Sequence, residues 1–285
     1  MSAHLPVSLS LFPGGRSKAL TLSYDDGVVD DRRLVEIFNR HGLRGTFHLN
    51  SGSLGREGNL APKEIAALFE GHEVSAHSVT HPFLEQLPPA AVIQELSEDR
   101  RRLEELCGYP VRGMSYPFGT YNEQVISLLS SIGIKYSRTV AKTREFNVPD
   151  NFLSWHPTIH HNDQLLETAQ RFIDIPAESG RARLKLFYVW GHSYEFGRQN
   201  NWDLIEQFGA KIGKRDDIWY ATNIEIVDYV QALRRVEFSA DFGLALNPTA
   251  AELWVVAGKS PVRLAAGSLT DLRTGESRPQ APWRS

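Results

Sequence analysis

The stretch Ala19 to Gly27, which reads ALTLSYDDG, decides the fold prediction. Its first six residues alternate apolar and polar side chains, a pattern typical of a β-strand. Asp25 and Asp26 end this strand, and the glycine after them frees the backbone to turn sharply. A helical pattern follows and ends at Gly42. The chain therefore opens with a strand–helix unit that carries two adjacent carboxylates at the end of its strand.

The same alternation of a short apolar run with a helical pattern continues along the chain. Six further strands are predicted, over Gly45–Asn50, His72–Ala76, Gly113–Tyr116, Ile134–Val140, Leu153–His160 and Leu184–Trp190. Helical patterns start at Pro62 and cover Ala90–Cys107, Val125–Ile132 and Leu165–Ile175. Strands that alternate with helices predict an α/β fold with a parallel sheet, and seven such units favour closure into a barrel. In barrels of this kind the chemistry lies at the C-terminal ends of the strands.

The sequence changes character after Arg235. Leu253 to Val256 and Val262 to Ala265 alternate around a Gly-Lys-Ser turn, which predicts a β-hairpin. We therefore expect a barrel over residues 1–235 and a small β-rich appendage over residues 236–285 that packs on it. A small carbohydrate-binding module is the alternative interpretation of the appendage.

The composition narrows the class of protein. The 285 residues are 41% hydrophobic and 23% charged, which excludes a disordered or low-complexity chain. A net charge of −3 gives no bulk attraction to nucleic acid or to an anionic membrane. The single cysteine, Cys107, excludes an intrachain disulfide and a thiolate metal cage. The first twenty residues lack the apolar run of a signal peptide, so the chain is expected to be cytoplasmic.

Two histidines follow the third predicted strand with a spacing of four residues. His77 and His81 can face one point if the backbone between them is helical or tightly turned, and both can then bind one metal ion. By themselves they are weak evidence, and the Asp-Asp-Gly segment alone is more simply a turn that caps a helix. Together, one aspartate and two imidazoles leave a coordination position open for water, as in catalytic zinc sites. The other carboxylate of the aspartate pair can take the proton of that water.

Two further segments lie at predicted strand ends. Tyr116-Pro117-Phe118-Gly119 forms an irregular turn, which either exposes backbone N–H groups to an oxyanion or is an ordinary turn rich in aromatic residues. His192 ends the last apolar strand. A lone histidine there is usually structural, but opposite a metal site it becomes a candidate general acid.

These four segments, in this order between about Leu20 and Tyr194, resemble the NodB-homology polysaccharide deacetylases, also called carbohydrate esterase family 4. The resemblance implies a distorted (β/α)7 barrel and a divalent metal, most simply Zn²⁺. It implies the following roles: Asp25 as catalytic base, Asp26, His77 and His81 as metal ligands, the Phe118 N–H, next to Tyr116, at the oxyanion, and His192 as catalytic acid.

The function implied is a metal-dependent hydrolase that removes N-acetyl groups from an amino sugar in an oligosaccharide or polysaccharide. One alternative is hydrolysis of a non-sugar C–N bond, in a small amide or a ureide, on the same barrel. Another is a carbohydrate-binding relative without catalysis. The expected partner is an N-acetylated carbohydrate or a small amide, with no nucleic acid or membrane, and the oligomeric state is left open.

The sequence departs from the family pattern at two places. Where the family has an arginine before the proline–aromatic pair, this chain has Ser115. We expect Arg138, on the next strand, to contact the catalytic aspartate instead. The family's Asp-Trp motif has only a loose counterpart in Asp150 and Trp155, so Asp150 is a doubtful candidate to orient His192.

A histidine-rich segment stays unassigned by these motifs. Strand periodicity places His156 and His160 on one face and His161 on the other. They are predicted to be structural, to line the substrate pocket, or to form a rival metal site with Asp163. Trp202 and Trp219 are expected to pack in the core, with stacking on sugar rings as the alternative.

Overall fold

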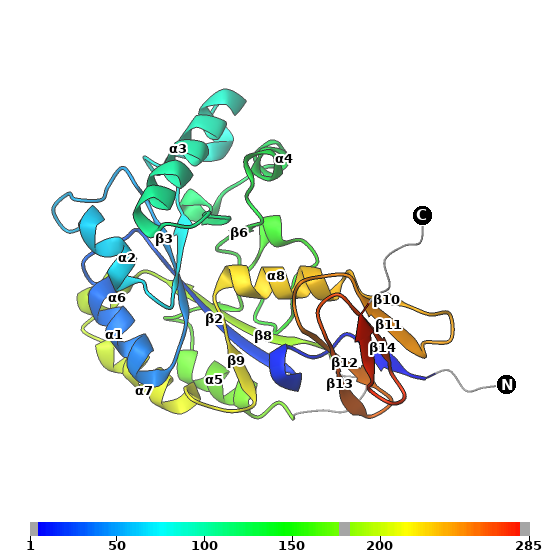
Figure 1. The fold of residues 1–285 in the computed structure, drawn as a ribbon. Helices are drawn as coiled ribbons and strands as arrows, with labels where there is room; N and C mark the ends of the chain where they lie inside the picture. Colours follow the sequence, from blue (N-terminus) through cyan, green and yellow to red (C-terminus); the bar gives the residue numbers. More distant parts are fainter. Residues whose placement is uncertain (1–4, 177–182, 280–285) are drawn as a thin grey trace.

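The computed structural model describes residues 5–176 and 183–279, and at its centre is a curled sheet of parallel strands (Figure 1). The strands follow the order β6-β5-β4-β3-β2-β8-β7, and β9 also pairs with β2. Their bounds are β2 Lys18–Asp25, β3 Gly45–Leu49, β4 Glu73–Ala76, β5 Gly113–Ser115, β6 Tyr136–Arg138, β7 Ile159–His160, β8 Lys185–Gly191 and β9 Ile218–Tyr220. The predicted α/β fold with a distorted barrel is confirmed.

The sheet differs from the seven predicted strands in two respects. The short strand β9 was not predicted, and the predicted strand Leu153–His160 is reduced to β7. Pro157 lies in the lost part and has no N–H to give to a sheet ladder. Instead, Trp155 forms a parallel bridge with Arg138, which links the segment before β7 to the β6 edge of the sheet. The two edges of the sheet therefore approach each other at Trp155.

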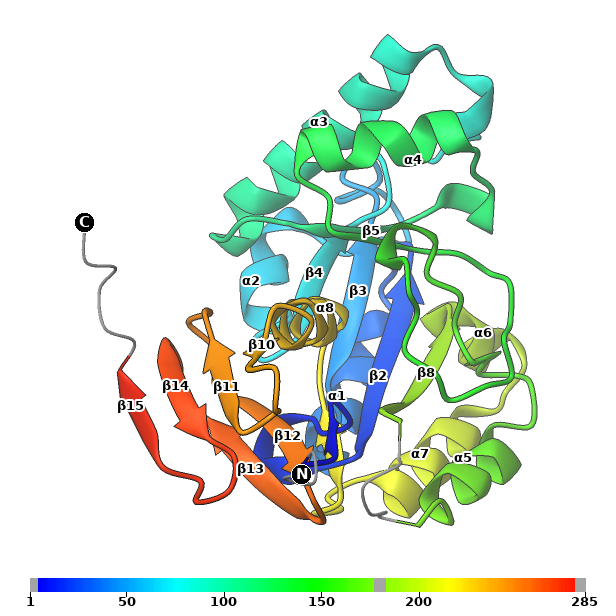
Figure 2. The same ribbon diagram turned by 90° about the vertical axis from the view of Figure 1, so that its right-hand side faces the viewer.

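Except for α8, which packs against the inner face of the sheet and shares a hydrophobic cluster with Ala19 of β2, the helices of the described part cover the outer side of the sheet (Figures 1 and 2). Their bounds are α1 Asp31–His41, α2 Ile65–Leu68, α3 Pro89–Cys107, α4 Glu123–Leu129, α5 Leu165–Ile173, α6 Ser193–Arg198, α7 Trp202–Ile212 and α8 Asn223–Leu233. Leu20, Leu22 and Tyr24 of β2 join the core that these helices form with the sheet. Because side chains alternate along a strand, Asp25 lies on the opposite, inner face together with Ser23.

The C-terminal region forms two small antiparallel sheets beside the barrel (Figure 2). Their strands are β1 Val7–Ser8, β10 Glu237–Phe238, β11 Leu244–Asn247, β12 Leu253–Ala257, β13 Ser260–Leu264, β14 Ser268–Asp271 and β15 Ser277–Pro279. The predicted hairpin is present as β12 and β13. β1, from the start of the chain, pairs with β12, and α8 packs against both β2 and β12. The division of the chain at Arg235 stays a prediction, and residues 280–285 lie outside the described part.

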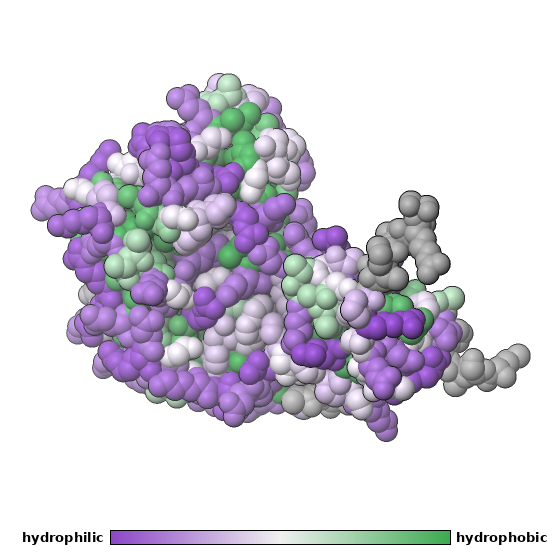
Figure 3. All heavy atoms as spheres, viewed as in Figure 1, coloured by the Kyte–Doolittle hydropathy of each residue, from purple (hydrophilic) through white to green (hydrophobic). Residues whose placement is uncertain are grey.

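On the face shown in Figure 3 hydrophilic residues predominate, and hydrophobic residues form small separate areas. Among the residues that the structure describes, no helix combines the length and the apolar character needed to span a membrane.

Candidate active site

The C-terminal ends of the parallel strands surround a cavity of about 570 Å³. Its lining includes every residue to which the family resemblance assigns a role, whereas Arg138 lies outside the lining and pairs with Asp25. Its walls are formed by Asp25, Asp26, His77, His81, Tyr116, Phe118, Gly119, Val140, Lys142, His160, Trp190, His192 and Tyr194. The structure therefore brings together side chains that are up to 169 positions apart in the sequence, from Asp25 to Tyr194.

The segment that carries the two histidines is a tight turn after β4. Ser78 and His81 both have positive φ, at 66° and 57°, so the turn is not helical. The buried carboxylate of Asp99, on α3, accepts hydrogen bonds from the backbone N–H groups of His77 and Ser51, at 2.9 Å and 2.8 Å. Helix α3 thus fixes the conformation of this turn. The positive φ angles of Ser78 and His81 are a form of backbone strain that is common at functional sites.

The ligand atoms of Asp26, His77 and His81 converge. The Nε2 atoms of the two histidines lie 3.1 Å apart, and Oδ1 of Asp26 lies 3.8 Å from Nε2 of His77. All three ligand atoms are within 4.8 Å of one another. Ligands at 2.0–2.1 Å from a tetrahedral zinc ion are about 3.3 Å apart, so small side-chain movements suffice to bind one ion.

The hydrogen bonds of His77 prepare it to bind a metal. Its Nδ1 lies 2.9 Å from the backbone oxygen of Ser115, which can only accept a hydrogen bond, so Nδ1 carries the proton. Nε2 then has a free lone pair that faces His81. Burial lowers the pKa of His77, although the neighbouring Asp25 and Asp26 oppose this effect. The neutral, oriented imidazole fits the predicted metal site.

Asp25 is buried in a network of donors at the end of β2. Its Oδ2 accepts a hydrogen bond from the guanidinium of Arg138, which is itself fully buried. Ser115 donates to Oδ1 at 3.2 Å, and its hydroxyl also lies 2.7 Å from Nδ1 of His77. Burial raises the pKa of Asp25, but Arg138 and His77 outweigh it and hold the pKa well below its ordinary value. The carboxylate is therefore ionised.

Glu195, which the sequence analysis did not identify, contacts His192. Oε1 of Glu195 lies 3.3 Å from Nδ1 of His192, and Nε2 of the same ring lies 4.0 Å from Oδ2 of Asp26. Burial lowers the pKa of His192, but Glu195 and the aspartate pair outweigh burial and raise it above its ordinary value. The spacing of three residues at the start of a helix was the available signal for this pair.

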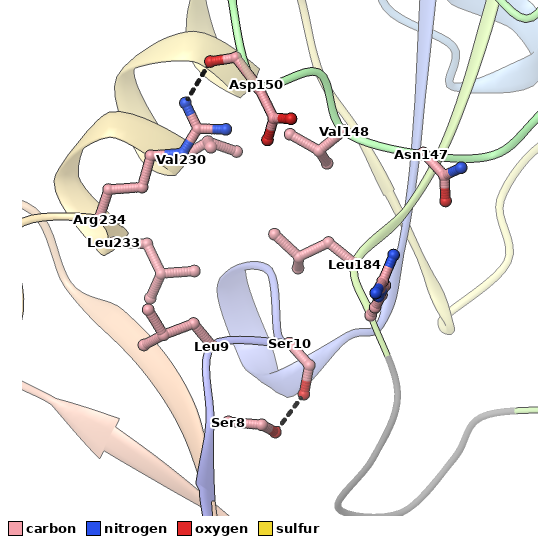
Figure 4. A pocket seen from close by; sticks show the side chains of 11 residues that line it. Ser8, Leu9, Ser10, Asn147, Val148, Asp150, Leu184, Val230, Leu233 and Arg234 are labelled. Carbon is pink, nitrogen blue, oxygen red and sulfur yellow. Dashed lines mark hydrogen bonds between the residues drawn. The ribbon is translucent and has the colours of Figure 1, made fainter. Parts of the chain in front are cut away.

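Asp150, the doubtful candidate for orienting His192, lies elsewhere. It lines a separate cavity of about 750 Å³ together with Leu9, Val148 and Leu184 (Figure 4). Its backbone oxygen accepts a hydrogen bond from Arg234 on α8. The interpretation of Asp150 as the partner of His192 is therefore wrong, because the chain from 147 to 150 passes this other cavity.

Of the unassigned histidines, His160 lines the cavity, as one of the alternatives predicted, but the predicted alternation of faces is not observed. His160 and His161 both lie beside Oε2 of Glu195, at 3.1 Å and 2.9 Å, although strand alternation placed them on opposite faces. The alternation fails because β7 ends at His160. Asp163 pairs with Lys142 at 2.7 Å and does not join the histidine cluster. His156 contacts the hydroxyl of Thr139 instead.

The two aromatic residues proposed near the oxyanion differ in exposure. Tyr116 is buried, stacks on Tyr121 and donates its hydroxyl to the backbone oxygen of Leu153 at 2.7 Å. Phe118 has a positive φ of 58° and is 49% exposed, and its ring stacks on Phe83 with centroids 3.9 Å apart. The assignment of the Phe118 N–H to an oxyanion stays a prediction.

The two tryptophans considered for sugar stacking lie against the core. Trp202 packs on Phe196, and Trp219 packs on Phe12 and Tyr229. Both are partly buried and neither lines the cavity at the strand ends.

Comparison with known proteins finds sequence matches to the N-terminal part of the barrel. Residues 13–137 match the model of a family described as polysaccharide deacetylase. A chitooligosaccharide deacetylase from Bradyrhizobium is 26% identical over 123 residues, which cover 41% of this chain and 54% of that protein. The peptidoglycan-N-acetylglucosamine deacetylase PgdA from Listeria monocytogenes is 27% identical over 111 residues, 38% of this chain and 23% of that protein. The chain thus spans about half or less of these curated relatives.

The fold likeness extends further along the chain than the sequence match. A crystal structure from Mycobacterium smegmatis, assigned as a polysaccharide deacetylase, has a TM-score of 0.57 at 19% identity. The superposition covers 82% of this chain and 96% of that one. The family match includes Asp25, Asp26, His77 and His81, whereas His192 lies beyond it. Residues 13–137, which carry four of the predicted site residues, are thus similar in sequence to the polysaccharide deacetylase family.

Proposed function

We propose that the protein is a metal-dependent deacetylase that hydrolyses the N-acetyl group of an amino sugar within an oligosaccharide or polysaccharide. The observation that carries the proposal is the pair of imidazole nitrogens of His77 and His81, 3.1 Å apart beside Asp26. A carboxylate, Asp25, and an imidazole, His192, line the same cavity. This arrangement offers a metal site together with a base and an acid.

Asp26, His77 and His81 would hold the divalent ion, with Zn²⁺ as the simplest choice for two nitrogen ligands and one oxygen ligand. When bound, such an ion supplies Lewis acidity, which lowers the pKa of a water ligand toward about 7 and polarises a carbonyl oxygen. The hydrogen bond from Nδ1 of His77 to Ser115 keeps Nε2 directed at the ion.

Asp25 accepts the proton of the attacking water. Its pairing with Arg138 keeps it ionised, so it is ready to accept a proton, while the same pairing weakens its basicity. Ser115 joins Asp25 to His77 through one hydroxyl, which fixes the distance between the base and the metal ligand. The base and the proposed metal site are thus held as one rigid unit.

His192 donates a proton to the nitrogen that leaves. Glu195 holds Nδ1, so Nε2 is the atom that faces the side of the cavity where Asp26 lies. Glu195 and the aspartate pair raise the pKa of His192 above its ordinary value, which favours the protonated ring that a proton donor needs. The backbone N–H of Phe118 would stabilise the negative oxygen that forms when the acetamide carbon is attacked. The C–N bond then breaks, and acetate and a free amine are released.

Three features support a carbohydrate as the substrate. Relatives named above act on chitooligosaccharide and on peptidoglycan N-acetylglucosamine. A second cleft, of about 860 Å³, shares Asp26, His81 and Tyr194 with the first, so the two together would have room for more than one sugar unit. The exposed stack of Phe83 and Phe118 offers an aromatic face to a sugar ring.

Acetate release tests this function. Metal-stripped protein is supplied with one equivalent of Zn²⁺ and incubated with N-acetylglucosamine oligomers, simple amides and ureides in parallel. The proposal expects acetate from the oligomers, with activity lost after chelation and restored by Zn²⁺. Turnover of the amide or ureide alone would favour the non-sugar alternative, and inactivity on every substrate would favour a binding protein.

A further inference from the structure

Three imidazoles surround the carboxylate of Glu195 at the edge of the cavity. Nε2 of His160 and Nε2 of His161 lie 3.1 Å and 2.9 Å from Oε2, and Nδ1 of His192 lies 3.3 Å from Oε1. His160 and His161 come from the end of β7, while Glu195 lies in the first turn of α6. His160 and His161 were considered for a rival metal site with Asp163, but the carboxylate that they contact is that of Glu195.

The donor atoms of His160, His192 and Glu195 have the spacing of a metal site. One ligand atom from each lies within 4.8 Å of the other two. Nε2 of His160 lies 3.1 Å from Oε2 of Glu195, and Nδ1 of His192 lies 3.3 Å from Oε1, so each imidazole approaches a different oxygen of the carboxylate. The three side chains are therefore close enough to bind one ion together, through one or both oxygens of Glu195.

His161, the fourth residue of the cluster, is buried and is not one of the three ligands. Its ring is fully buried between Tyr24 and Phe196, with centroid distances of 5.7 Å and 4.2 Å. Within the described residues, both of its ring nitrogens and Oε2 of Glu195 are buried and lack an aligned hydrogen-bond partner. Oε2 of Glu195 thus lacks a well-aligned hydrogen-bond donor, and a cation bound to the carboxylate would give this oxygen a partner.

We propose that His160, His192 and Glu195 form a second divalent-cation site, and that its occupation inhibits the enzyme by engaging His192. Two imidazoles and one carboxylate favour Zn²⁺, Ni²⁺ or Cu²⁺ over Mg²⁺ and Ca²⁺, which prefer oxygen ligands. The existence of the site is independent of the proposed function. The inhibition rests on that function, because it requires His192 to be the proton donor.

The inhibition follows from the chemistry of the imidazole. To bind a cation, Nδ1 of His192 must release its proton to solvent and offer its lone pair. The ring then keeps a single proton, on Nε2, and can no longer act as an imidazolium. A neutral imidazole N–H is a poor acid, so the departing amine would lose its proton donor.

Metal stoichiometry tests the site directly. The metal-free full-length protein is dialysed against excess Zn²⁺ and its metal content is measured by mass spectrometry. Wild type should hold two ions and His160→Gln one, while His156→Gln, a matched histidine change outside the cluster, should hold two. The proposal is overturned if wild type holds one ion, or if His160→Gln still holds two.

A cobalt titration of the wild-type protein tests the same site without any substitution. The visible absorption of Co²⁺ should rise in two successive phases, one for each ion, while Mg²⁺ should displace neither. Activity on N-acetylglucosamine oligomers should reach its maximum after the first phase and fall roughly 10²-fold over the second, the usual contribution of a general acid. A single phase contradicts the second site, and a second phase without loss of activity contradicts the inhibition. Inactivity after the first phase contradicts the proposed function but leaves the two-ion count intact.

Discussion

At the scale of single residues, the proposed chemistry depends on how each polar group is held. Arg138 and the Ser115 hydroxyl hold Asp25 in the wall of the cavity, and Glu195 holds His192 there. The short motifs Asp25-Asp26 and His77–His81 could be found in the sequence because their members are close together in the chain.

Other residues of the site were harder to find in the sequence. The position of Arg138 followed from strand placement, and the structure puts it against Asp25. Glu195 could not be assigned from its position, because carboxylates in the first turn of a helix are common for reasons unrelated to catalysis. Ser115 was noted only as a departure from the family pattern, and its two contacts depend on the curvature of the sheet.

The first residue-scale prediction concerns the base. Asp25→Asn preserves the shape of the side chain and should leave zinc binding within about twofold of wild type, because Asp25 is not a proposed ligand. Turnover of N-acetylglucosamine oligomers should fall at least about 10²-fold, the usual contribution of a general base. Asp163→Asn, a surface carboxylate paired with Lys142, is the matched control and should keep full turnover. Full activity of Asp25→Asn would exclude Asp25 as the base.

The second concerns the orientation of the acid. Glu195→Gln removes the charge beside Nδ1 of His192 and should slow acetate release from N-acetylated sugars roughly 10-fold to 100-fold. Hydrolysis of 4-nitrophenyl acetate should change little, because nitrophenolate leaves without protonation. Comparing the two rates for one variant separates this role from general damage to the site. An equal loss on both substrates would show that Glu195 acts on structure rather than on the proton donor.

At the scale of elements, regular strands and helices with clear periodicity were predictable and short or interrupted ones were not. Helix α3 differs by one residue from its predicted start. The predicted strand around Pro157 fails because proline lacks an N–H, and β9 is too short, at three residues, to show a periodic pattern. The failure at β7 matters most, because it places His160 and His161 on the same side as Glu195.

A glycine at the end of β8 tests the close packing behind this cluster. A Cβ atom on Gly191 would lie 2.1 Å from Nδ1 of His161, whose ring is confined between Tyr24 and Phe196. Gly191→Ala should therefore destabilise the fold by about 1–3 kcal/mol, measured by urea unfolding. Gly197→Ala, where the nearest atom is a carboxylate oxygen at 3.4 Å, is the matched control and should cost nothing measurable. Equal stability of both variants would contradict the packing described.

Strand β4 carries a buried carboxylate whose protonation is linked to stability. Burial raises the pKa of Glu73 to about 7, even though Ile224, Tyr136 and Thr46 donate hydrogen bonds to it. Because the folded state holds this proton more tightly than the unfolded state, the stabilisation is present below about pH 4.5 and is lost as pH rises toward 7.

Urea unfolding across pH measures this linkage. Relative to Glu73→Gln, which cannot titrate, the wild-type protein should lose about 3 kcal/mol of unfolding free energy between pH 4.5 and 7. The difference between the two proteins should then stay constant above pH 7. A difference that does not change with pH, or that grows in favour of wild type, would contradict this environment for Glu73.

At the scale of the whole molecule, the barrel and the β-rich appendage share a core. Phe12, residues of α8 such as Ile226, and Leu253 of β12 lie in one hydrophobic cluster. The hydroxyl of Tyr229, on α8, donates to the backbone oxygen of Leu11 and accepts from the N–H of Trp254. The sequence predicted a β-rich appendage on the barrel, but not that the start of the chain pairs with it, because a two-residue strand carries no periodic signal.

The central claim is that Asp26, His77 and His81 hold one metal ion on which acetate release depends. The most direct measurement is zinc content together with acetate release for His77→Ala, made in the His160→Gln background so that the second cluster cannot retain an ion. We predict one zinc ion per chain and activity in the His160→Gln protein, and neither after His77→Ala is added. The His156→Ala change in the same background is the control and should keep its zinc. A His77→Ala, His160→Gln protein that still binds stoichiometric zinc or still releases acetate would contradict the account.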